Sequence, residues 1–208
     1  MPSLGRLHLI TDTRPGRDAL AVARAALAKA GPRLVLQVRV EDSATDRDAY
    51  ELAGRMVAEC AAVGATCLVN DRLHVALAAG AAGGHVGALD LPVAAARRVL
   101  GPDAVLGATA REAVAARAAV TAGASYLGVG PCHATSTKVG LPAPIGPAGV
   151  RAVAAAVDVP VIAIGGVTAA RVPELVAAGA YGVAVVAAVS AAADPGRATD
   201  ELLRALPC

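Results

Sequence analysis

Aromatic side chains are nearly absent from this chain of 208 residues, which contains no Trp, no Phe and three Tyr. Proteins that bind single-stranded nucleic acid stack its bases on aromatic rings, so the composition argues against that class. The formal net charge is +2, from 19 basic and 17 acidic residues. Because so small a charge gives no strong field toward DNA or an anionic membrane, we expect neither as a partner.

The chain also lacks the cysteine spacing of disulfide frameworks and zinc sites. Its four cysteines include no Cys-x-x-Cys pair, which predicts reduced thiols and a cytoplasmic location. No basic segment followed by an apolar run opens the sequence, so no signal peptide is expected. One uncharged run covers Leu175–Ala193, but it is rich in Ala and interrupted by Gly. We interpret it as a helix end, a turn and a buried strand rather than a membrane helix.

What the chain does have is a regular alternation of short aliphatic runs with Ala-rich segments of helical length, such as Asp46–Val63 and Pro147–Val157. The runs are continuously apolar, which indicates parallel strands buried on both faces. We predict strands at Leu7–Thr11, Leu34–Val40, Thr66–Asn70, Gly84–Gly87, Val105–Thr109, Tyr126–Gly130, Val161–Gly165 and Gly182–Val189.

Eight strand–helix units in roughly 200 residues match the lower size limit of the (β/α)8 TIM barrel. No linker-like segment divides the chain, so residues 1–208 are predicted to form a single TIM-barrel domain of the α/β class. The rival interpretation is a doubly wound open sheet, which normally has a Gly-x-Gly-x-x-Gly turn after its first strand. Residues 11–16 read Thr-Asp-Thr-Arg-Pro-Gly and do not match that turn.

In a TIM barrel the chemistry lies where the strands end, so polar residues there are candidates for the site. Asp71 and Asp90 follow neighbouring predicted strands, and two carboxylates completed by substrate oxygens and water suit Mg²⁺. An equally good interpretation is that each carboxylate caps the following helix or pairs with Arg72 or Arg39. His85 lies within a predicted strand and is interpreted as a structural, hydrogen-bonded residue.

Two further segments suit phosphate groups. Gly165–Thr168 (Gly-Gly-Val-Thr) follows a strand and precedes a helix, where backbone N–H groups face an anion. We favour phosphate binding here over the alternative, a tight turn capped by Thr168. Thr135–Lys138 (Thr-Ser-Thr-Lys) carries hydroxyls and an ammonium group suited to phosphate or pyrophosphate, although a solvated loop is the simpler interpretation of that segment alone. We find no arrangement of residues in the sequence that would make a protein nucleophile. The two candidate phosphate segments and the carboxylate pair therefore indicate group transfer by positioning and electrostatics.

Together these motifs resemble the thiamine-phosphate synthase family, the thiamine monophosphate synthase/TenI-like group of TIM barrels. The resemblance covers residues 7–190, and its segments are specific in combination although each is weak alone. They are Leu7–Asp12, Gln37-x-Arg39, Asn70-Asp71-Arg72, Gly84–Gly87 with Asp90-Leu91-Pro92, Gly128–Pro131, Thr135–Lys138 and Ala163–Val167.

The resemblance implies an enzyme that joins hydroxymethylpyrimidine diphosphate to thiazole phosphate, giving thiamine phosphate and pyrophosphate. It implies Mg²⁺ held by Asp71 and Asp90, and catalytic roles for Arg39, Thr109 and Lys138. The small-molecule substrates are the implied partners, and a homo-oligomer is compatible with the sequence. The substrate-binding positions that it implies are Gln37, Arg39, Glu41, Asn70, Thr109, Thr135, Ser136, Thr137, Lys138, Gly166, Val186 and Ala187.

The sequence departs from the family pattern at several of these positions. The pattern Gln-x-Arg-x-Lys ends here in Glu41, so a carboxylate replaces an expected lysine. Ala88 stands in place of a usual Gln, and Thr109 and Ala187 each replace a usual Ser. Arg111 replaces a His that TenI-like thiazole tautomerases tie to proton transfer, which argues against that activity.

The departures leave a second hypothesis open, a TenI-like paralogue that binds thiazole phosphate or thiamine phosphate without synthase turnover. Alternation along a strand places Glu41 on the same face as Arg39, toward the diphosphate. A carboxylate there repels the substrate unless a cation neutralises it. We expect Arg111, with Arg14 behind it, to be that cation.

Overall fold

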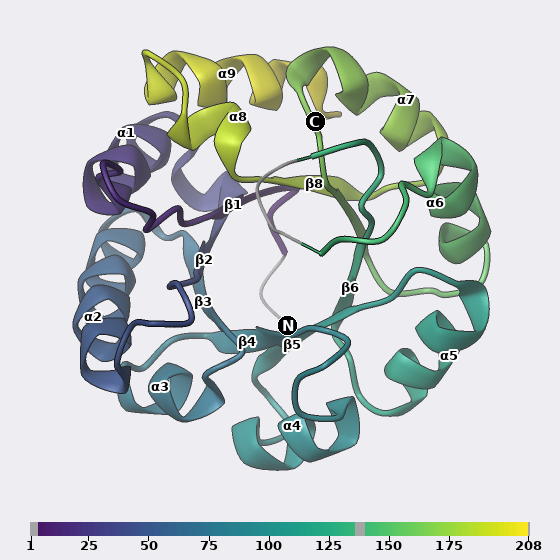
Figure 1. Ribbon diagram of the computed structural model, residues 1–208, viewed down its shortest axis with the longest axis horizontal. Helices are drawn as coiled ribbons and strands as arrows, with labels where there is room; N and C mark the ends of the chain where they lie inside the picture. Colours follow the sequence, from purple (N-terminus) through teal and green to yellow (C-terminus); the bar gives the residue numbers. More distant parts are fainter. Residues whose placement is uncertain (1–3, 136–139, 208) are drawn as a thin grey trace.

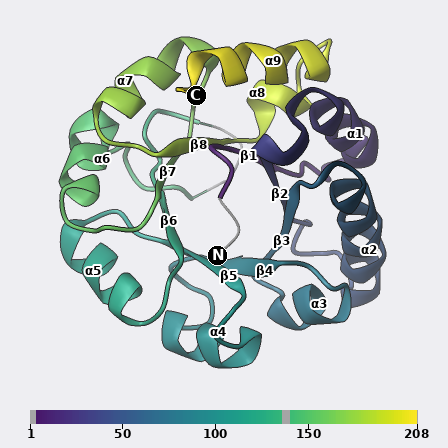
Figure 2. The same ribbon diagram turned by 180° about the vertical axis from the view of Figure 1, so that it is seen from behind.

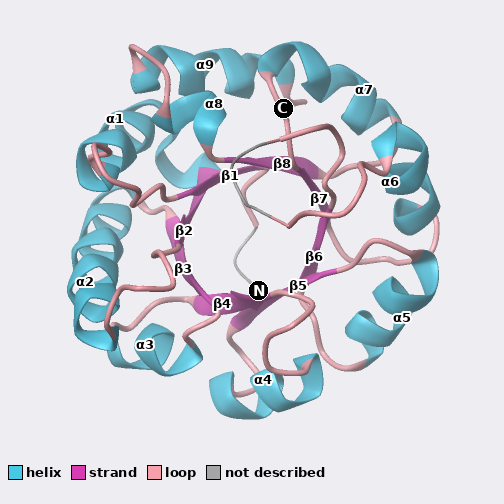
Figure 3. Ribbon diagram, in the orientation of Figure 1, coloured by secondary structure: helices cyan, strands magenta, loops and turns pink. Residues whose placement is uncertain are grey.

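The computed structural model describes residues 4–135 and 140–207, and it shows a closed barrel of eight parallel strands. The strands follow one another around the barrel in chain order, and helices form a ring outside them (Figures 1 and 3). The first and last strands close the barrel, with Leu7 paired with Val183. The predicted (β/α)8 barrel is confirmed.

The strands are short, and the helices differ widely in length. The strands are β1 (Leu7–Ile10), β2 (Leu34–Val38), β3 (Thr66–Asn70), β4 (Gly83–Val86), β5 (Val105–Thr109), β6 (Tyr126–Val129), β7 (Val161–Ile164) and β8 (Gly182–Val185). The helices are α1 (Ala19–Ala30), α2 (Asp46–Val63), α3 (Leu73–Ala78), α4 (Val93–Leu100), α5 (Ala113–Thr121), α6 (Gly146–Ala154), α7 (Val172–Ala177), α8 (Ala187–Ser190) and α9 (Pro195–Ala205), with 3-10 turns η1 (Gly31–Arg33) and η2 (Ala169–Arg171). Helix α8 contacts both α1 and α9, as the view from behind also shows (Figure 2).

Local sequence signals account for the long helix α2, which has its predicted bounds. The Thr45 hydroxyl accepts a bond from the Asp48 N–H at 3.2 Å, and the Asp48 carboxylate accepts one from the Thr45 N–H at 2.9 Å. This reciprocal pair satisfies N–H groups that a helix start leaves without partners. The helix ends at Gly64, whose φ of 72° favours glycine. Helix α6 begins one residue before its predicted range and ends at Ala154.

The aliphatic side chains form two layers. One layer fills the space between the strands and the helices, as parallel strands buried on both faces require. The other fills the barrel interior and consists of Ile10, Val35, Leu68, Tyr126, Ile162 and Ala184. Tyr126 is the largest of the fully buried side chains, at 1% exposure. The other members of this interior layer are aliphatic side chains that pack with the aromatic ring.

Two predicted strands are too long. The second ends at Val38 instead of Val40, and the eighth ends at Val185 instead of Val189. Residues Ala187–Ser190 form α8, and Val189 is buried there. A short, continuous apolar run does not distinguish a buried strand from a buried helix, which explains the error. The remaining strand boundaries agree with the prediction within one residue.

The uncharged run Leu175–Ala193 divides largely as expected. It covers the end of α7, a turn and β8, followed by the short helix α8 that the prediction lacked. In the part of the chain that the structure describes, every helix is too short or too polar to cross a bilayer.

Candidate active site

The carboxyl ends of the strands form one rim, along which most of the predicted site residues lie. Gln37 is instead inside β2 and buried within the barrel. Ser136, Thr137 and Lys138 fall outside the described residues. The rim carries Arg39 and Glu41 after β2, Asn70 and Asp71 at the end of β3, Asp90 after β4, Thr109 at the end of β5, Thr135 after β6, Gly166 after β7, and Val186 and Ala187 after β8.

A chain of hydrogen bonds crosses the barrel interior and ends at this rim. Gln37 Nε2 donates to Tyr126 Oη at 3.4 Å. Tyr126 Oη lies 3.1 Å from His85 Nδ1, and His85 Nε2 lies 3.0 Å from Thr109 Oγ1. Two predicted site residues therefore occupy the ends of one buried chain. The prediction that His85 is a structural, hydrogen-bonded residue is confirmed, whereas Tyr126 carries no motif that marked it.

Burial keeps the barrel interior uncharged. It lowers the pKa of His85 to about 4, against a smaller opposing effect of Asp90. It also raises the pKa of Tyr126 far above its ordinary value. The ring of His8 lies edge-on to Tyr126, with centroids 5.1 Å apart, and burial followed by the nearby His85 lowers the pKa of His8 to about 3. At neutral pH both imidazoles and the phenol are therefore neutral.

Two glycines provide the space for these rings. A Cβ atom on Gly107 of β5 would overlap Tyr126 and His85 Nδ1. A Cβ atom on Gly128 of β6 would lie 3.0 Å from His85 Cε1. Glycine inside a strand often marks such a close approach. The two strand glycines are visible in the sequence, but the sequence does not show which side chains lie against them.

Asp71 and Asp90 present exposed carboxylates at the ends of neighbouring strands. The backbone of Asp71 is left-handed, with φ of 60°, which Asp tolerates better than most residues. Its N–H donates to the His85 carbonyl at 2.9 Å. Asp90 Oδ2 accepts a bond from the Gly87 N–H at 2.6 Å. Helices α3 and α4 have other N-cap residues and no side-chain cap, so the helix-capping alternative is not what the structure shows.

Arg39 and Glu41 form an ion pair beyond the end of β2, so the strand alternation expected to align them does not extend to these residues. Arg39 Nη1 lies 3.7 Å from Glu41 Oε1. The segment after β1 fixes both backbones: Thr11 Oγ1 accepts from the Arg39 N–H at 2.8 Å, and Thr13 Oγ1 accepts from the Glu41 N–H at 3.2 Å. The rim therefore carries a cation and an anion side by side at β2.

The expected pairing of Glu41 with Arg111 is wrong. Arg111 Nη2 donates to the Ala143 carbonyl at 2.6 Å, and the ion-pair partner of Glu41 within the described chain is Arg39. Strand order explains the difference, because β2 and β5 are not neighbours in the barrel. Arg72, a proposed partner of Asp71, forms an ion pair with Asp46 at 3.0 Å.

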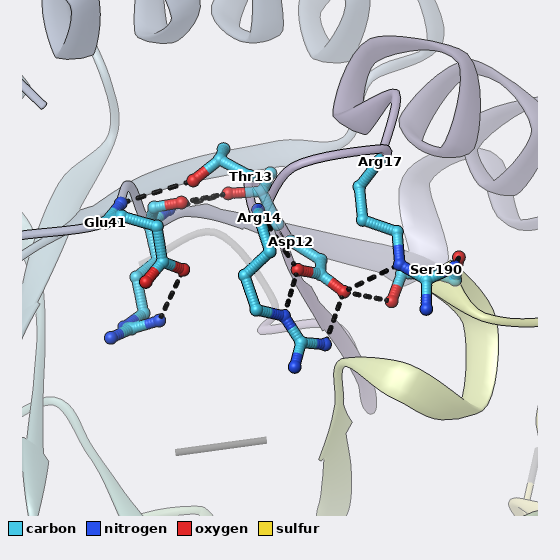
Figure 4. A network of polar contacts seen from close by, with 8 residues as sticks. Asp12, Thr13, Arg14, Arg17, Glu41 and Ser190 are labelled. Atoms are coloured by element: carbon cyan, nitrogen blue, oxygen red, sulfur yellow. Dashed lines mark hydrogen bonds and ion pairs between the residues drawn. The ribbon is translucent and has the colours of Figure 1, made fainter. Parts of the chain in front are cut away.

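Asp12 is a further candidate that the motifs did not single out as a site residue. Its buried carboxylate accepts two bonds from the Arg14 guanidinium, each at 2.8 Å, and one from Ser190 Oγ at 3.0 Å (Figure 4). Arg17 Nε lies 3.6 Å from the same group. The Arg14 bonds are the main cause that lowers the pKa of Asp12 to about 2. Because Ser190 belongs to α8, this cluster ties the segment after β1 to α8.

The Gly165-Gly166 turn after β7 is tightly packed. The two residues have φ of 94° and 63°, conformations that favour glycine. A Cβ atom on Gly166 would lie 2.6 Å from the Ala134 carbonyl oxygen and 2.8 Å from His133 Cβ. The Thr168 side chain makes no capping bond, so the capped-turn alternative lacks its hydrogen bond. The turn instead brings its backbone against the segment that leads to Thr135–Lys138.

Comparison with known proteins agrees with the fold and identifies the family. The chain matches the model of the thiamine monophosphate synthase family over residues 7–189. A relative named thiamine-phosphate synthase from Salinispora arenicola is 72% identical over 208 residues, which are 100% of both chains. A relative of the same name from Salinispora tropica is 70% identical over 206 residues, 99% of each chain. The solved structure of a thiamine phosphate pyrophosphorylase from Pyrococcus furiosus has a TM-score of 0.86 and 32% identity, covering 96% of this chain and 94% of that one. The chain therefore belongs to the thiamine monophosphate synthase family and is a transferase of the thiamine-phosphate synthase type.

Proposed function

We propose that this transferase joins hydroxymethylpyrimidine diphosphate to thiazole phosphate. The bond between the pyrimidine methylene carbon and the diphosphate oxygen breaks, and its electron pair leaves with pyrophosphate. The thiazole nitrogen then forms the new bond to the cation-like methylene carbon, giving thiamine phosphate. The observation that carries the proposal is the rim itself, which gathers a guanidinium, a hydroxyl and two carboxylates without requiring a protein nucleophile.

The β2–β5 side of the rim supports departure of the diphosphate. We assign catalytic roles to Arg39, Thr109 and Lys138, which would stabilise negative charge on the leaving group, and a diphosphate contact to Asn70. Gln37 would face the pyrimidine, and its position at one end of the buried hydrogen-bond chain supports that role. Lys138 is assigned through the family motif, because it lies outside the described residues.

The β6–β8 side of the rim would hold the thiazole phosphate. Hydroxyls of Thr135, Ser136 and Thr137 would contact it, together with the backbone at Gly166, Val186 and Ala187. The packing of the Gly165-Gly166 turn against Ala134 supports this assignment, since it brings the turn and the Thr135 segment together. Val186 is the N-cap of α8 and supplies no side-chain cap, so the first backbone N–H groups of α8 would be open to a phosphate.

Asp71 and Asp90 fit a Mg²⁺ ion. This ion is usually held by one or two carboxylates and completes its shell with water and substrate phosphates. Two exposed carboxylates at neighbouring strand ends meet that requirement. No group of three or more His, Cys, Asp or Glu within residues 4–135 and 140–207 could enclose a metal ion, so substrate oxygens would complete the coordination. When bound, the ion would offset the charge of the departing pyrophosphate.

Asp71→Asn and Asp90→Asn test the metal assignment. Each removes an anionic ligand, so we expect thiamine phosphate formation to fall by at least about tenfold at any Mg²⁺ concentration. The thermal midpoint should change little, because both side chains are exposed. Product formation across a Mg²⁺ titration, with calorimetry of each variant, measures both quantities. Asp103→Asn is the matched control, an exposed aspartate ahead of β5 at the opposite end of the barrel. Near-normal turnover with lowered stability in both variants would contradict the assignment.

Glu41→Gln tests the main departure from the family pattern. The carboxylate repels a diphosphate and pairs with Arg39 at 3.7 Å. Removing its charge should lower the KM for the pyrimidine diphosphate about fivefold, which corresponds to about 1 kcal/mol. The control Glu59→Gln removes an acid paired with Arg24 on the outer helices. A raised KM would show that Glu41 is needed to hold Arg39.

Because Arg111 contacts Ala143, combining Glu41→Gln with Arg111→Ala should give additive effects.

The alternative function, a TenI-like paralogue without synthase turnover, draws on one observation. Glu41 places a carboxylate beside Arg39 at the rim, where a diphosphate requires positive charge. The two functions differ in one measurable respect, since a paralogue would bind thiamine phosphate without making it.

A further inference from the structure

We propose that the buried chain Gln37–Tyr126–His85–Thr109 is directional, with each member donating toward Thr109, so that the Thr109 hydroxyl donates its own hydrogen to a substrate oxygen. Tyr126 and His85 are then positioning residues of the active site rather than passive core residues. The direction of the chain stands on the geometry of the barrel interior. Its use on the diphosphate rests on the proposed function.

The direction is determined first at Tyr126. Its side chain is buried, and its hydroxyl has one hydrogen to donate. Gln37 Nε2 approaches Oη at 3.4 Å but can only donate. Among the described neighbours of Oη, His85 Nδ1 at 3.1 Å is the atom that can accept. A buried hydroxyl hydrogen left without an acceptor is costly, so Tyr126 donates to His85 Nδ1.

The proton on His85 follows from that bond. Nδ1 accepts and therefore carries no hydrogen. The ring is buried inside the barrel and neutral, and a neutral imidazole has one N–H group. That N–H is on Nε2, which lies 3.0 Å from Thr109 Oγ1. Gly107 and Gly128 leave room for the ring in this orientation, because a side chain at either position would meet it.

Thr109 then has a defined role at the rim. It is the last residue of β5 and half-buried. Its oxygen accepts the imidazole N–H, so its own hydrogen points elsewhere, and the rim is where a substrate oxygen would lie. At the other end, the Gln37 amide nitrogen is engaged by Tyr126, which leaves Oε1 to accept from a substrate N–H. The hydrogen-bond chain thus orients the Thr109 hydroxyl as a donor to an anionic group and Gln37 Oε1 as an acceptor from a heterocycle.

The direction can be measured without any activity. Long-range ¹⁵N–¹H NMR of histidine-labelled protein at pH 7 distinguishes the two neutral tautomers, and His85→Gln identifies the signal of His85. We expect hydrogen on Nε2 in the wild type and a mixture of tautomers in Tyr126→Phe, which removes the donor to Nδ1. Hydrogen on Nδ1 in the wild type, or an unchanged tautomer in Tyr126→Phe, would overturn the proposal.

The link to Thr109 is tested by a double-mutant cycle on kcat. Thr109→Val should lower kcat at least about tenfold, Thr109→Ser should restore most of it, and Tyr126→Phe should lower it less. Tyr126→Phe should add no further loss in the Thr109→Val background, because it acts through that hydroxyl. Tyr181→Phe is the matched control: its hydroxyl binds the Leu4 carbonyl at 2.8 Å, away from this chain.

Additive losses in the cycle would show that the two hydroxyls act independently and would overturn the positioning role. A loss in the Tyr181→Phe control equal to that in Tyr126→Phe would do the same. An inactive wild type would count against the proposed function instead, and the tautomer measurement would still decide the direction of the chain.

Discussion

Acidifying the protein from pH 7 to pH 5 is expected to lower its free energy of unfolding by about 4 kcal/mol. Burial lowers the pKa of His8 to about 3 and that of His85 to about 4, whereas both ionise near 6.5 in the unfolded chain. At pH 5 the unfolded chain therefore binds a proton at each histidine and the folded protein binds neither. The stabilisation is complete above pH 6.5 and is lost as the pH falls toward the folded pKa values, by about 2 kcal/mol per histidine at pH 5.

Urea unfolding at several pH values between 7 and 5 measures this loss. His8→Phe keeps a ring beside Tyr126 but cannot be protonated, so it should remove about half of the pH dependence. His74→Gln is the control, because the His74 side chain is 65% exposed. Asp12 does not affect this measurement. Because its pKa in the folded protein is about 2, its contribution to the free energy of unfolding falls only below about pH 4. An equal pH dependence in the wild type and His8→Phe would contradict the account of a neutral, buried His8.

Gly107→Ala should destabilise the protein by about 2 to 3 kcal/mol. The added Cβ atom would overlap Tyr126 and His85, which are both buried and hydrogen-bonded to each other. Neither ring can move away without breaking that bond. The expected result is a lower urea midpoint at pH 7, together with a changed environment of the histidine ring in NMR spectra.

Gly54→Ala is the matched control for this substitution. Gly54 lies in the middle of α2, and its added Cβ atom would have no atom within 4 Å. Alanine is the better helix former, so this variant should be more stable by about 0.5 to 1 kcal/mol. Equal midpoints for Gly107→Ala and the wild type would show that the barrel interior has room to spare.

The barrel was predictable because its signals are local. Continuous aliphatic runs indicate buried parallel strands, and the Thr45 cap and Gly64 mark the ends of α2. Once the strands are placed, topology alone brings the residues after each strand to one rim, which is why Asp71, Asp90 and Thr109 could be selected. The short helix α8 was not predicted, because its apolar residues continue the apolar run of β8.

Side-chain partners depend on which strands are neighbours and were predicted less well. Glu41 pairs with Arg39 rather than with Arg111, because β2 lies beside β1 and β3. His85 and Tyr126 are 41 residues apart in the sequence but in contact in the barrel. The sequence shows Gly107, which makes room for both rings, but does not show that these two rings are what it accommodates. The Asp12 cluster likewise joins the segment after β1 to Ser190 near the other end of the chain. Such contacts become visible only when the barrel closes.

The most direct test of the account is product formation by the purified wild-type protein. The protein is incubated with hydroxymethylpyrimidine diphosphate, thiazole phosphate and Mg²⁺, and thiamine phosphate and pyrophosphate are followed together, while calorimetry records binding of thiamine phosphate. We predict that both products appear in equal amounts, and that omitting either substrate abolishes them. Binding of thiamine phosphate without product at high enzyme concentration would contradict the synthase account and favour the paralogue.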